Sequence, residues 1–199
     1  MKKAGSQSES GFPLKIAILG KKSVGKTALT YRFVKNKYPT EHDTTIEDTY
    51  TVPVILDDIH CQFEILDTGG QDDYQTMLDT WINSNDGFIL VFSIDNKESF
   101  ESTKVFYERI IKLKEDKKGK IVVVGNKCDL EESRKVSREE VENFYTSKKI
   151  TFMETSALKN ICVKEIFLAV AFGLLKINFP ERYDSEGSEE DGKESCIFF

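Results

Sequence analysis

The stretch Gly20–Thr27, which reads GKKSVGKT, decides the fold class of this 199-residue chain. It fits the pattern GxxxxGK(S/T), between the apolar run Leu14–Leu19 and the helically spaced stretch Thr27–Lys37. A strand that turns into a helix directs backbone N–H groups and the positive helix end at an anion. The Lys26 ammonium adds charge for the outer phosphates, and the Thr27 hydroxyl can bind Mg²⁺. The stretch therefore predicts a nucleoside triphosphate site rather than an ordinary glycine-rich turn.

The rest of the chain alternates between predicted strands and predicted helices. Short apolar runs indicate strands over Leu14–Leu19, Thr49–Leu56, Cys61–Leu66, Gly87–Ser93, Lys120–Gly125 and Ile150–Glu154. Helical spacing of apolar residues indicates helices over Thr27–Lys37, Lys97–Lys117, Ser137–Ser147 and from Val163 onward. Ser137 is the predicted N-cap of the third helix, because Glu140 follows it at the capping-box spacing. This alternation predicts an α/β fold, with a six-stranded, mostly parallel sheet flanked by about five helices. Ligands of such sheets bind at the carboxyl ends of the strands.

Composition and charge describe one globular domain with two polar ends. Hydrophobic residues make up 39% of the chain and charged residues 31%, which is typical of a folded protein. We expect a disordered extension over residues 1–12, a folded domain over 13–179 and a flexible acidic tail over 180–199. The tail has a formal charge of −5 out of −6 for the whole chain. This distribution disfavours nucleic acid as a partner.

Cysteine spacing and hydropathy bear on the compartment in which the protein is expected. The four cysteines lie far apart without a CxxC pair, which disfavours a disulfide framework or a zinc site and indicates a reducing, intracellular compartment. The longest apolar run, Phe167–Leu175, is shorter than the ~18 residues of a transmembrane helix. The N-terminus lacks the apolar segment of a signal peptide, and Lys2 replaces the glycine that myristoylation needs.

A second motif, Asp67–Gln71 or DTGGQ, follows another apolar strand. A carboxylate such as Asp67 at a strand end beside a phosphate loop can hold Mg²⁺, and the Thr45 hydroxyl can add a second ligand. Gly70 can bring its N–H close to a γ-phosphate because it has no side chain. Gln71 has the length and polarity to orient an attacking water.

A third motif, Asn126–Asp129 or NKCD, lies at the end of the next strand. The Asp129 carboxylate can accept the N1–H and 2-amino group of guanine, which adenine lacks, and the Lys127 stem can lie along the base. The segment Glu154–Ala157 ends the last strand, where the Ala157 N–H can donate to guanine O6. These residues favour guanine over adenine.

Two other classes of protein remain open from these residues. A P-loop ATPase or small-molecule kinase would share the first motif, but it leaves NKCD and Glu154–Ala157 unexplained. A GTP-binding interaction module without useful hydrolysis is kept open by Lys22 and Gly69.

Together these segments resemble the signature of the small GTPases, and Thr45–Tyr50 (TIEDTY) resembles the Ras family, near Ras, Rap and Rheb. The resemblance covers Leu14 to about Asn178. It implies a P-loop G domain in a monomer that binds GTP or GDP with Mg²⁺, hydrolyses GTP and signals to effectors in the GTP state. It also implies an exchange factor, a GTPase-activating protein and Ras-binding-type effectors that add a strand beside the second strand.

The same resemblance assigns roles to single residues. Gln71 is expected to be catalytic, and Thr27, Thr45 and Asp67 are expected to bind Mg²⁺. The nucleotide is expected to contact Gly20, Lys21, Lys22, Ser23, Val24, Gly25, Lys26, Thr27, Ala28, Tyr38, Thr45, Gly70, Asn126, Lys127, Asp129, Ser156, Ala157 and Leu158. Effectors are expected to contact Thr45, Ile46, Glu47, Asp48, Thr49 and Tyr50.

Three departures from the Ras pattern bear on the rate of hydrolysis and on base binding. Lys22 and Ser23 stand where Ras has two glycines, although Rheb-like proteins carry Arg-Ser there. Gly69 replaces the usual alanine, and Leu158 replaces the usual lysine. A long Lys22 side chain can crowd Gln71 and an incoming arginine finger. We therefore expect slow intrinsic hydrolysis and a weak response to Ras-type activating proteins.

The C-terminal residues Cys196–Phe199 (CIFF) fit the C-a-a-X pattern, and phenylalanine at the last position favours geranylgeranylation. An ordinary cysteine in a frayed apolar end is the alternative. One lipid is a marginal anchor, and the acidic tail is repelled by an anionic leaflet. We therefore expect a prenyltransferase to modify Cys196, and the protein to lie on the cytoplasmic face of a membrane with a substantial cytosolic pool.

Overall fold

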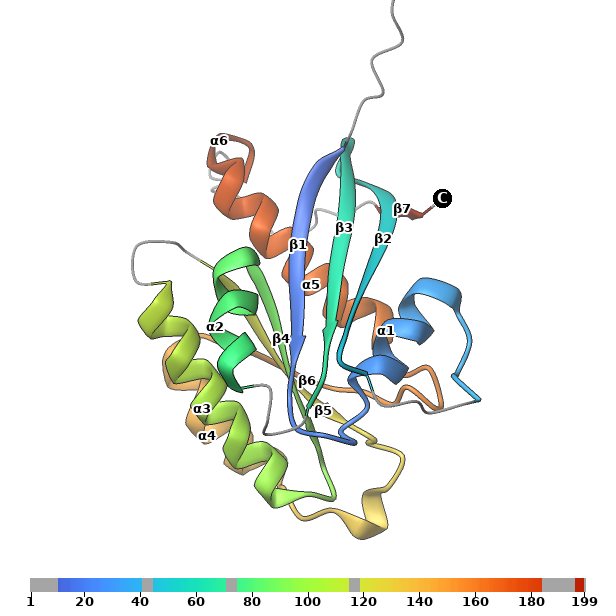
Figure 1. The fold of residues 1–199 in the computed structure, drawn as a ribbon, viewed down its shortest axis with the longest axis vertical. Helices are drawn as coiled ribbons and strands as arrows, with labels where there is room; N and C mark the ends of the chain where they lie inside the picture. The colour runs from blue at the N-terminus through green and yellow to red at the C-terminus, as the bar shows by residue number, and fades with distance from the viewer. Residues whose placement is uncertain (1–10, 41–44, 71–74, 115–118, 184–195, 199) are drawn as a thin grey trace, which may run out of the picture.

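The computed structural model describes residues 11–40, 45–70, 75–114, 119–183 and 196–198. Its centre is one sheet with the strand order β6-β5-β4-β1-β3-β2-β7 (Figure 1). The strands are β1 (Phe12–Leu19), β2 (Glu47–Leu56), β3 (Ile59–Thr68), β4 (Gly87–Ser93), β5 (Lys120–Asn126), β6 (Thr151–Glu154) and β7 (Cys196–Phe198). Strands β1 and β3 to β6 run parallel, whereas β2 is antiparallel to β3 and to β7. The predicted six-stranded, mostly parallel sheet is confirmed, with β7 as an additional short edge strand.

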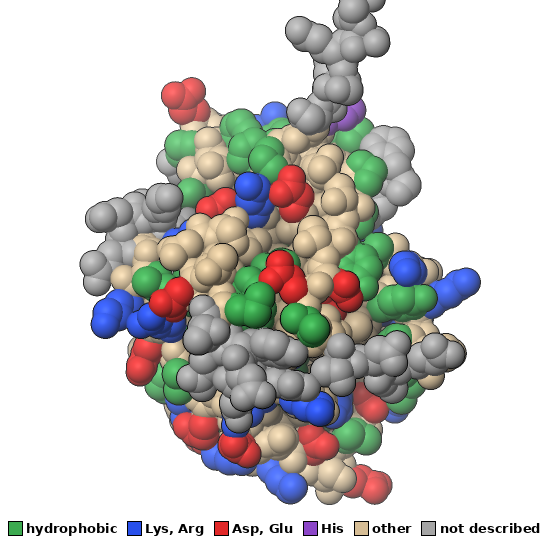
Figure 2. All heavy atoms as spheres, viewed as in Figure 1, with side chains coloured by type: hydrophobic (Ala, Val, Ile, Leu, Met, Phe, Trp, Pro, Cys, Tyr) green, Lys and Arg blue, Asp and Glu red, His purple; other side chains and the backbone are tan. Residues whose placement is uncertain are grey.

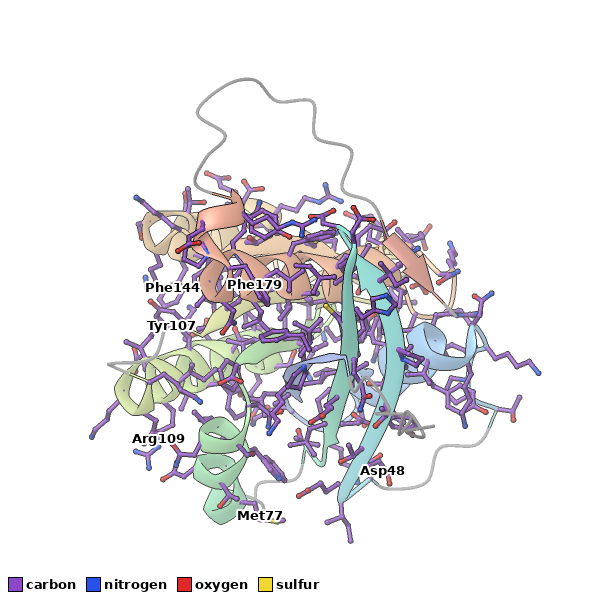
Figure 3. All side chains as sticks on the ribbon, turned by 90° about the horizontal axis from the view of Figure 1, so that it is seen from above. Asp48, Met77, Tyr107, Arg109, Phe144 and Phe179 are labelled. Carbon is purple, nitrogen blue, oxygen red and sulfur yellow. The ribbon has the colours of Figure 1, made fainter. Side chains whose placement is uncertain are left out.

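Helices cover the sheet on two faces. Within the described residues they are α1 (Lys26–Lys35), α2 (Gln75–Ser84), α3 (Lys97–Leu113), α4 (Arg138–Tyr145), α5 (Val163–Asn178) and α6 (Pro180–Tyr183). Helices α1 and α5 contribute to one hydrophobic cluster, and α2, α3 and α4 contribute to the other. Figure 3 shows this separation, with Phe179 beyond the end of α5 and Met77 on α2 at opposite sides of the sheet.

Alternation along β1 explains the two clusters. Ile16 and Ile18 belong to the cluster under α1 and α5, whereas Ala17 and Leu19 belong to the cluster under α2, α3 and α4. Every one of these four side chains is almost completely buried. Because both faces of the strand are covered, its sequence is a continuous apolar run rather than an alternating one. The carboxyl end of β1 is thereby fixed at the centre of the sheet.

Local turn and cap signals agree with the structure. Asp57 and Asp58 have positive φ angles of 46° and 61°, as a two-residue turn between β2 and β3 requires. The Ser137 hydroxyl accepts a hydrogen bond from the Glu140 N–H at 3.2 Å, which confirms the predicted N-cap of α4. The Glu140 carboxylate pairs with Lys97 of α3 and so also joins two helices.

The main differences from the sequence predictions concern α2, the end of α3 and the C-terminal residues. Helix α3 ends at Leu113, four residues before its predicted end. Helix α2 had no predicted range, although Met77, Leu78, Trp81 and Ile82 follow helical spacing. Residues 180–183 form α6 and residues 196–198 form β7, where only a flexible tail was expected. No helix among the described residues combines the length and the hydrophobicity of a membrane span.

Candidate nucleotide-binding site

The loop between β1 and α1 is built around Gly25 and Lys26. Gly25 has φ +99°, and a Cβ there would lie 2.3 Å from Asn126 Nδ2, so only glycine fits. Lys26 is 6% exposed, and its ammonium donates to the carbonyl oxygens of Gly20 at 2.9 Å and Lys21 at 3.0 Å. Burial lowers the Lys26 pKa to about 8, and the negative charge of Asp67 partly opposes this shift. The loop therefore wraps around a buried lysine, as an anion-binding loop requires.

Two hydroxyls and a carboxylate converge beside this loop. Thr27 Oγ1, at the start of α1, lies 3.0 Å from Thr45 Oγ1, just before β2. Asp67, near the end of β3, is completely buried, and neither of its carboxylate oxygens has a hydrogen-bond partner among the described residues. Burial raises the Asp67 pKa to about 6, while the Thr27 hydroxyl and the charge of Lys26 act in the opposite direction.

This donor set fits a divalent cation. A buried carboxylate without a partner is costly unless something compensates its charge. Hydroxyl and carboxylate oxygens are the protein ligands that Mg²⁺ prefers, and it usually keeps several waters and binds phosphate oxygens as well. Thr27, Thr45 and Asp67 are therefore the described residues that could hold such a cation.

Gly69 and Gly70 connect this site to the segment before β2. The Gly69 N–H donates to the Ile46 carbonyl oxygen at 2.7 Å. A Cβ on Gly70 would lie 2.5 Å from the backbone of Lys21 and of Lys22, so Gly70 packs directly on the phosphate loop. Gln71, predicted to be catalytic, lies outside the described residues, and its role stays a prediction.

Asn126 holds three loops together at the carboxyl end of β5. Its Nδ2 donates to the Val24 carbonyl oxygen at 2.8 Å, and its Oδ1 accepts from Thr155 Oγ1 at 3.1 Å and from the Ala157 N–H at 3.3 Å. Asn126 is 1% exposed, so these bonds are made away from water. The phosphate loop and the two loops predicted to read the base are thereby held in one arrangement.

Asp129 is oriented by the same neighbourhood. One of its carboxylate oxygens accepts a hydrogen bond from the buried Ser156 hydroxyl. The Ser156 oxygen in turn accepts from the Lys159 N–H at 3.0 Å. These bonds limit the rotation of the carboxylate that is predicted to bind guanine.

Comparison with known proteins agrees with this geometry. The model of the Ras family matches residues 15–176, which include the phosphate loop, Thr45–Tyr50 and the motifs at Asp67, Asn126 and Glu154, but not Cys196–Phe199. The chain belongs to the Ras family. As a Ras-family protein it is a GTP-binding switch and a small GTPase.

Two curated relatives show how far the similarity extends. The Ras-like protein rasB of Dictyostelium discoideum is 42% identical over 156 residues, which cover 78% of this chain and 79% of the relative. Ras-like protein 2 of Drosophila melanogaster is 33% identical over 183 residues, which cover 92% of this chain and 95% of the relative.

The structure also places four further residues of this Ras-family protein that were predicted to contact the nucleotide, namely Lys21, Lys22, Ser23 and Tyr38. The Lys21 ammonium pairs with Glu98 of α3, while its backbone carbonyl oxygen accepts a hydrogen bond from Lys26. Lys22 and Ser23 are exposed, and they line a cleft of about 510 Å³ together with Lys127. Tyr38 is half-buried against the cluster under α1 and α5.

The predicted effector segment is exposed over most of its length. Ile46 is 58% exposed, and Glu47, Asp48 and Thr49 are also exposed. Figure 3 shows Asp48 on β2 and Met77 on α2 at the same side of the molecule. On the face seen in Figure 2, acidic, basic and apolar side chains are interspersed among uncharged ones.

Sequence reasoning missed Arg32, on α1. Its guanidinium donates to the Ala157 carbonyl oxygen at 3.0 Å and to the Leu158 carbonyl oxygen at 3.1 Å. The arginine therefore fixes the loop that is predicted to read guanine O6. No local signal distinguishes it from an ordinary surface arginine on a helix. The Leu158 side chain is 55% exposed.

A buried carboxylate supports the same loop from β6. The Glu154 side chain is 7% exposed and pairs with Arg134 and Arg138. Arg134 also pairs with Glu131, which is far more exposed. Glu154 directly precedes Thr155, so this ion-pair cluster positions the start of the base-reading loop.

Proposed function

We propose that this protein switches with the bound nucleotide through the segment that begins at Thr45. The hydrogen bond between Thr27 and Thr45, beside the unpartnered Asp67 carboxylate, carries this proposal. Mg²⁺, when bound, would supply positive charge to the β- and γ-phosphates. In that state Thr45 and Gly70 stay near the phosphate loop, and loss of the γ-phosphate releases them. The released segment no longer presents Thr45–Tyr50 to effectors in the same form.

The base-binding half of the proposal is recognition of guanine by Asp129. Its carboxylate accepts two N–H groups from guanine, while Lys127 lies along the ring. A carboxylate facing adenine would lack both donors, which discriminates strongly against ATP. A competition assay with a fluorescent GDP tests this. Displacement by GTP and GDP with no displacement by ATP is expected, and equal displacement by ATP would favour the ATPase or kinase class.

Hydrolysis is proposed to use Gln71, which orients a water for in-line attack while Lys26 stabilises charge on the phosphates. We propose a slow intrinsic rate because Lys22 lies exposed on the loop where Ras has glycine. Single-turnover GTP hydrolysis, with and without a Ras-family activating protein, measures this. The Lys22→Gly/Gly69→Ala variant should hydrolyse GTP faster than the wild type. Equal rates would remove the explanation based on these two residues.

Effector binding is proposed to occur at Thr45–Tyr50, in a monomer that also needs an exchange factor. The exposure of Ile46 and its neighbours on an edge-proximal strand supports this surface. A Ras-binding domain should bind the GTP-loaded protein and bind the GDP-loaded protein much more weakly. The Asp48→Ala variant should lose this binding while it keeps its affinity for GDP. Binding that is independent of the nucleotide would contradict the switch.

A further inference from the structure

The C-terminal strand β7 has no part in nucleotide chemistry, yet the structure gives it a defined place. Residues 196–198 pair antiparallel with β2, with Cys196 opposite Leu56, Ile197 opposite Ile55 and Phe198 opposite Val54. Figure 1 shows β7 beside β2, with the C-terminus close by. The segment that carries the predicted lipidation motif is thus an additional strand of the sheet.

The edge of β2 is suited to receive a strand. On its other side β2 pairs with β3 along its whole length, so without β7 it would be the edge of the sheet. An edge strand presents backbone N–H and C=O groups that a further strand can satisfy. The pairing with β7 stops at Val54, and the next residue, Pro53, has no N–H to donate. Pro53 therefore separates the β7 contact from the effector segment, which remains uncovered by β7.

A second contact directs the tail toward this edge. Helix α6 ends at Tyr183, whose hydroxyl donates to the Asp57 carboxylate at 2.9 Å. Arg182 donates to the Asp57 carbonyl oxygen. Burial and the neighbouring Asp57 raise the pKa of Tyr183 to about 12, which keeps the phenol protonated as a donor. Asp57 directly follows the β2 segment that pairs with β7, so the tail leaves the body next to its docking strand.

We propose that the β2 edge at Val54–Leu56 is a strand-docking site and that the C-terminal residues of the same chain occupy it in the unprocessed protein. The tether makes this docking intramolecular, so a pairing of only three residues is favoured by a high effective concentration. An enzyme that modifies Cys196 acts on the released tail. Docking of the tail on β2 therefore competes with the modification of Cys196. The proposal does not depend on GTP binding or hydrolysis.

Disulfide trapping in the full chain tests the register. In a Cys196→Ser background, the pair Ile55→Cys/Ile197→Cys places two cysteines directly opposite each other, at a Cα separation of about 5 Å that a disulfide can bridge. The pair Thr51→Cys/Ile197→Cys is the matched control, because Thr51 lies on the same face of β2 but about 13 Å further along it. Variants with only one of the two introduced cysteines measure how much cross-linking involves the native cysteines.

Mild oxidation should cross-link the first pair within one chain and leave the control pair largely reduced. Equal cross-linking of both pairs, or none in either, would overturn the proposal. A disulfide-linked dimer would also overturn it, because the tail would then dock on a second copy.

Hydrogen exchange supplies a measurement that needs no new cysteine. In a chain that ends at residue 195, at least one amide among residues 54–56 should exchange several-fold faster than in the full chain. Amides of β5 should be unchanged, because β5 lies in the interior of the sheet. Identical exchange at residues 54–56 in both chains would show that β7 does not dock.

Discussion

At the scale of single residues, the site depends on polar side chains whose partners lie far away in the sequence. Asn126 and Val24 are separated by 102 positions, and Arg32 and Ala157 by 125. Asp67 differs from these residues because its carboxylate is buried with no hydrogen-bond partner among the described residues. These arrangements lead to two predictions.

Asn126→Ala should weaken nucleotide binding strongly. The change leaves the Val24 carbonyl, the Thr155 hydroxyl and the Ala157 N–H without their partner, at a cost of about 1–3 kcal/mol for each buried group that stays unpaired. We expect the dissociation constant for GDP to rise roughly 10- to 100-fold, since about 1.4 kcal/mol corresponds to a factor of ten. Asn85→Ala is the matched control, because Asn85 is a buried asparagine whose side chain donates to Trp81 and Ser84 of the adjacent helix α2. A similar loss of GDP affinity in the control would contradict a specific role for Asn126.

Asp67→Asn should remove a pH dependence of the free energy of unfolding in the protein without bound cation or nucleotide. The folded pKa of about 6 lies above the ordinary value of 3.8, so the folded state binds this proton more tightly than the unfolded chain does. The contribution of Asp67 to stability is therefore fully present below about pH 4 and is lost as the pH rises through 6. The loss is at most about 3 kcal/mol, at 1.36 kcal/mol per pKa unit. The charge of Lys26 lowers the Asp67 pKa, and the charge of Asp48 raises it.

Urea unfolding in EDTA at several pH values checks this prediction. The asparagine variant should lose less stability than the wild type between pH 5 and 7, and it should no longer gain stability from added Mg²⁺. A wild type whose stability stays constant over that range would show that Asp67 has no raised pKa.

At the scale of elements, α2 contacts β2 and α3 through interactions of different kinds. The Trp81 indole N–H donates to the Glu47 carboxylate of β2 at 2.7 Å, and Trp81 is only 4% exposed. Asp79 pairs with Arg109 of α3 at the surface. The first contact joins α2 to the effector segment, so it couples the two regions that border the phosphate loop.

Glu47→Ala should loosen α2 more than Asp79→Ala does. The first variant removes the carboxylate that accepts from a largely buried indole N–H, at a cost on the order of 1 kcal/mol, whereas the exposed ion pair contributes less. Trp81 is the only tryptophan of the chain, so its fluorescence emission reports on this helix directly. We expect an emission shift and faster amide exchange in α2 for Glu47→Ala, with little change for Asp79→Ala. The opposite ranking would show that α2 is held mainly through α3.

At the scale of the whole molecule, we propose that the acidic tail and the C-terminal motif together set how the protein divides between membrane and cytosol. The formal charge of −6 lies mainly in the tail, directly before Cys196. One prenyl chain gives only marginal membrane affinity, and an acidic tail adds no attraction to an anionic leaflet.

Cys196→Ser should shift the protein from a mixed to a wholly cytosolic distribution. We expect the wild type to divide between membrane and cytosolic fractions in cells that carry the prenyltransferase. A variant with Cys162→Ser is the matched control, because Cys162 lies at the start of α5 and outside the motif. Equal membrane fractions for the wild type and Cys196→Ser would contradict lipid anchoring.

Local sequence patterns determined much of this protein. Periodicity predicted the six main strands, and the N-cap at Ser137 was predicted from its spacing to Glu140, because such signals depend only on near neighbours. The three motifs were placed at strand ends for the same reason, and parallel strands bring those ends to one edge of the sheet.

Only the tertiary structure decided which distant groups meet. The contacts of Arg32 with Ala157, of Trp81 with Glu47 and of β7 with β2 join segments that are far apart along the chain. No local propensity encodes them, since each depends on how the crossovers of the sheet bring separate loops together. The motifs of the Ras family were therefore readable from sequence, whereas the side chains that hold these motifs in position became visible only in the folded chain.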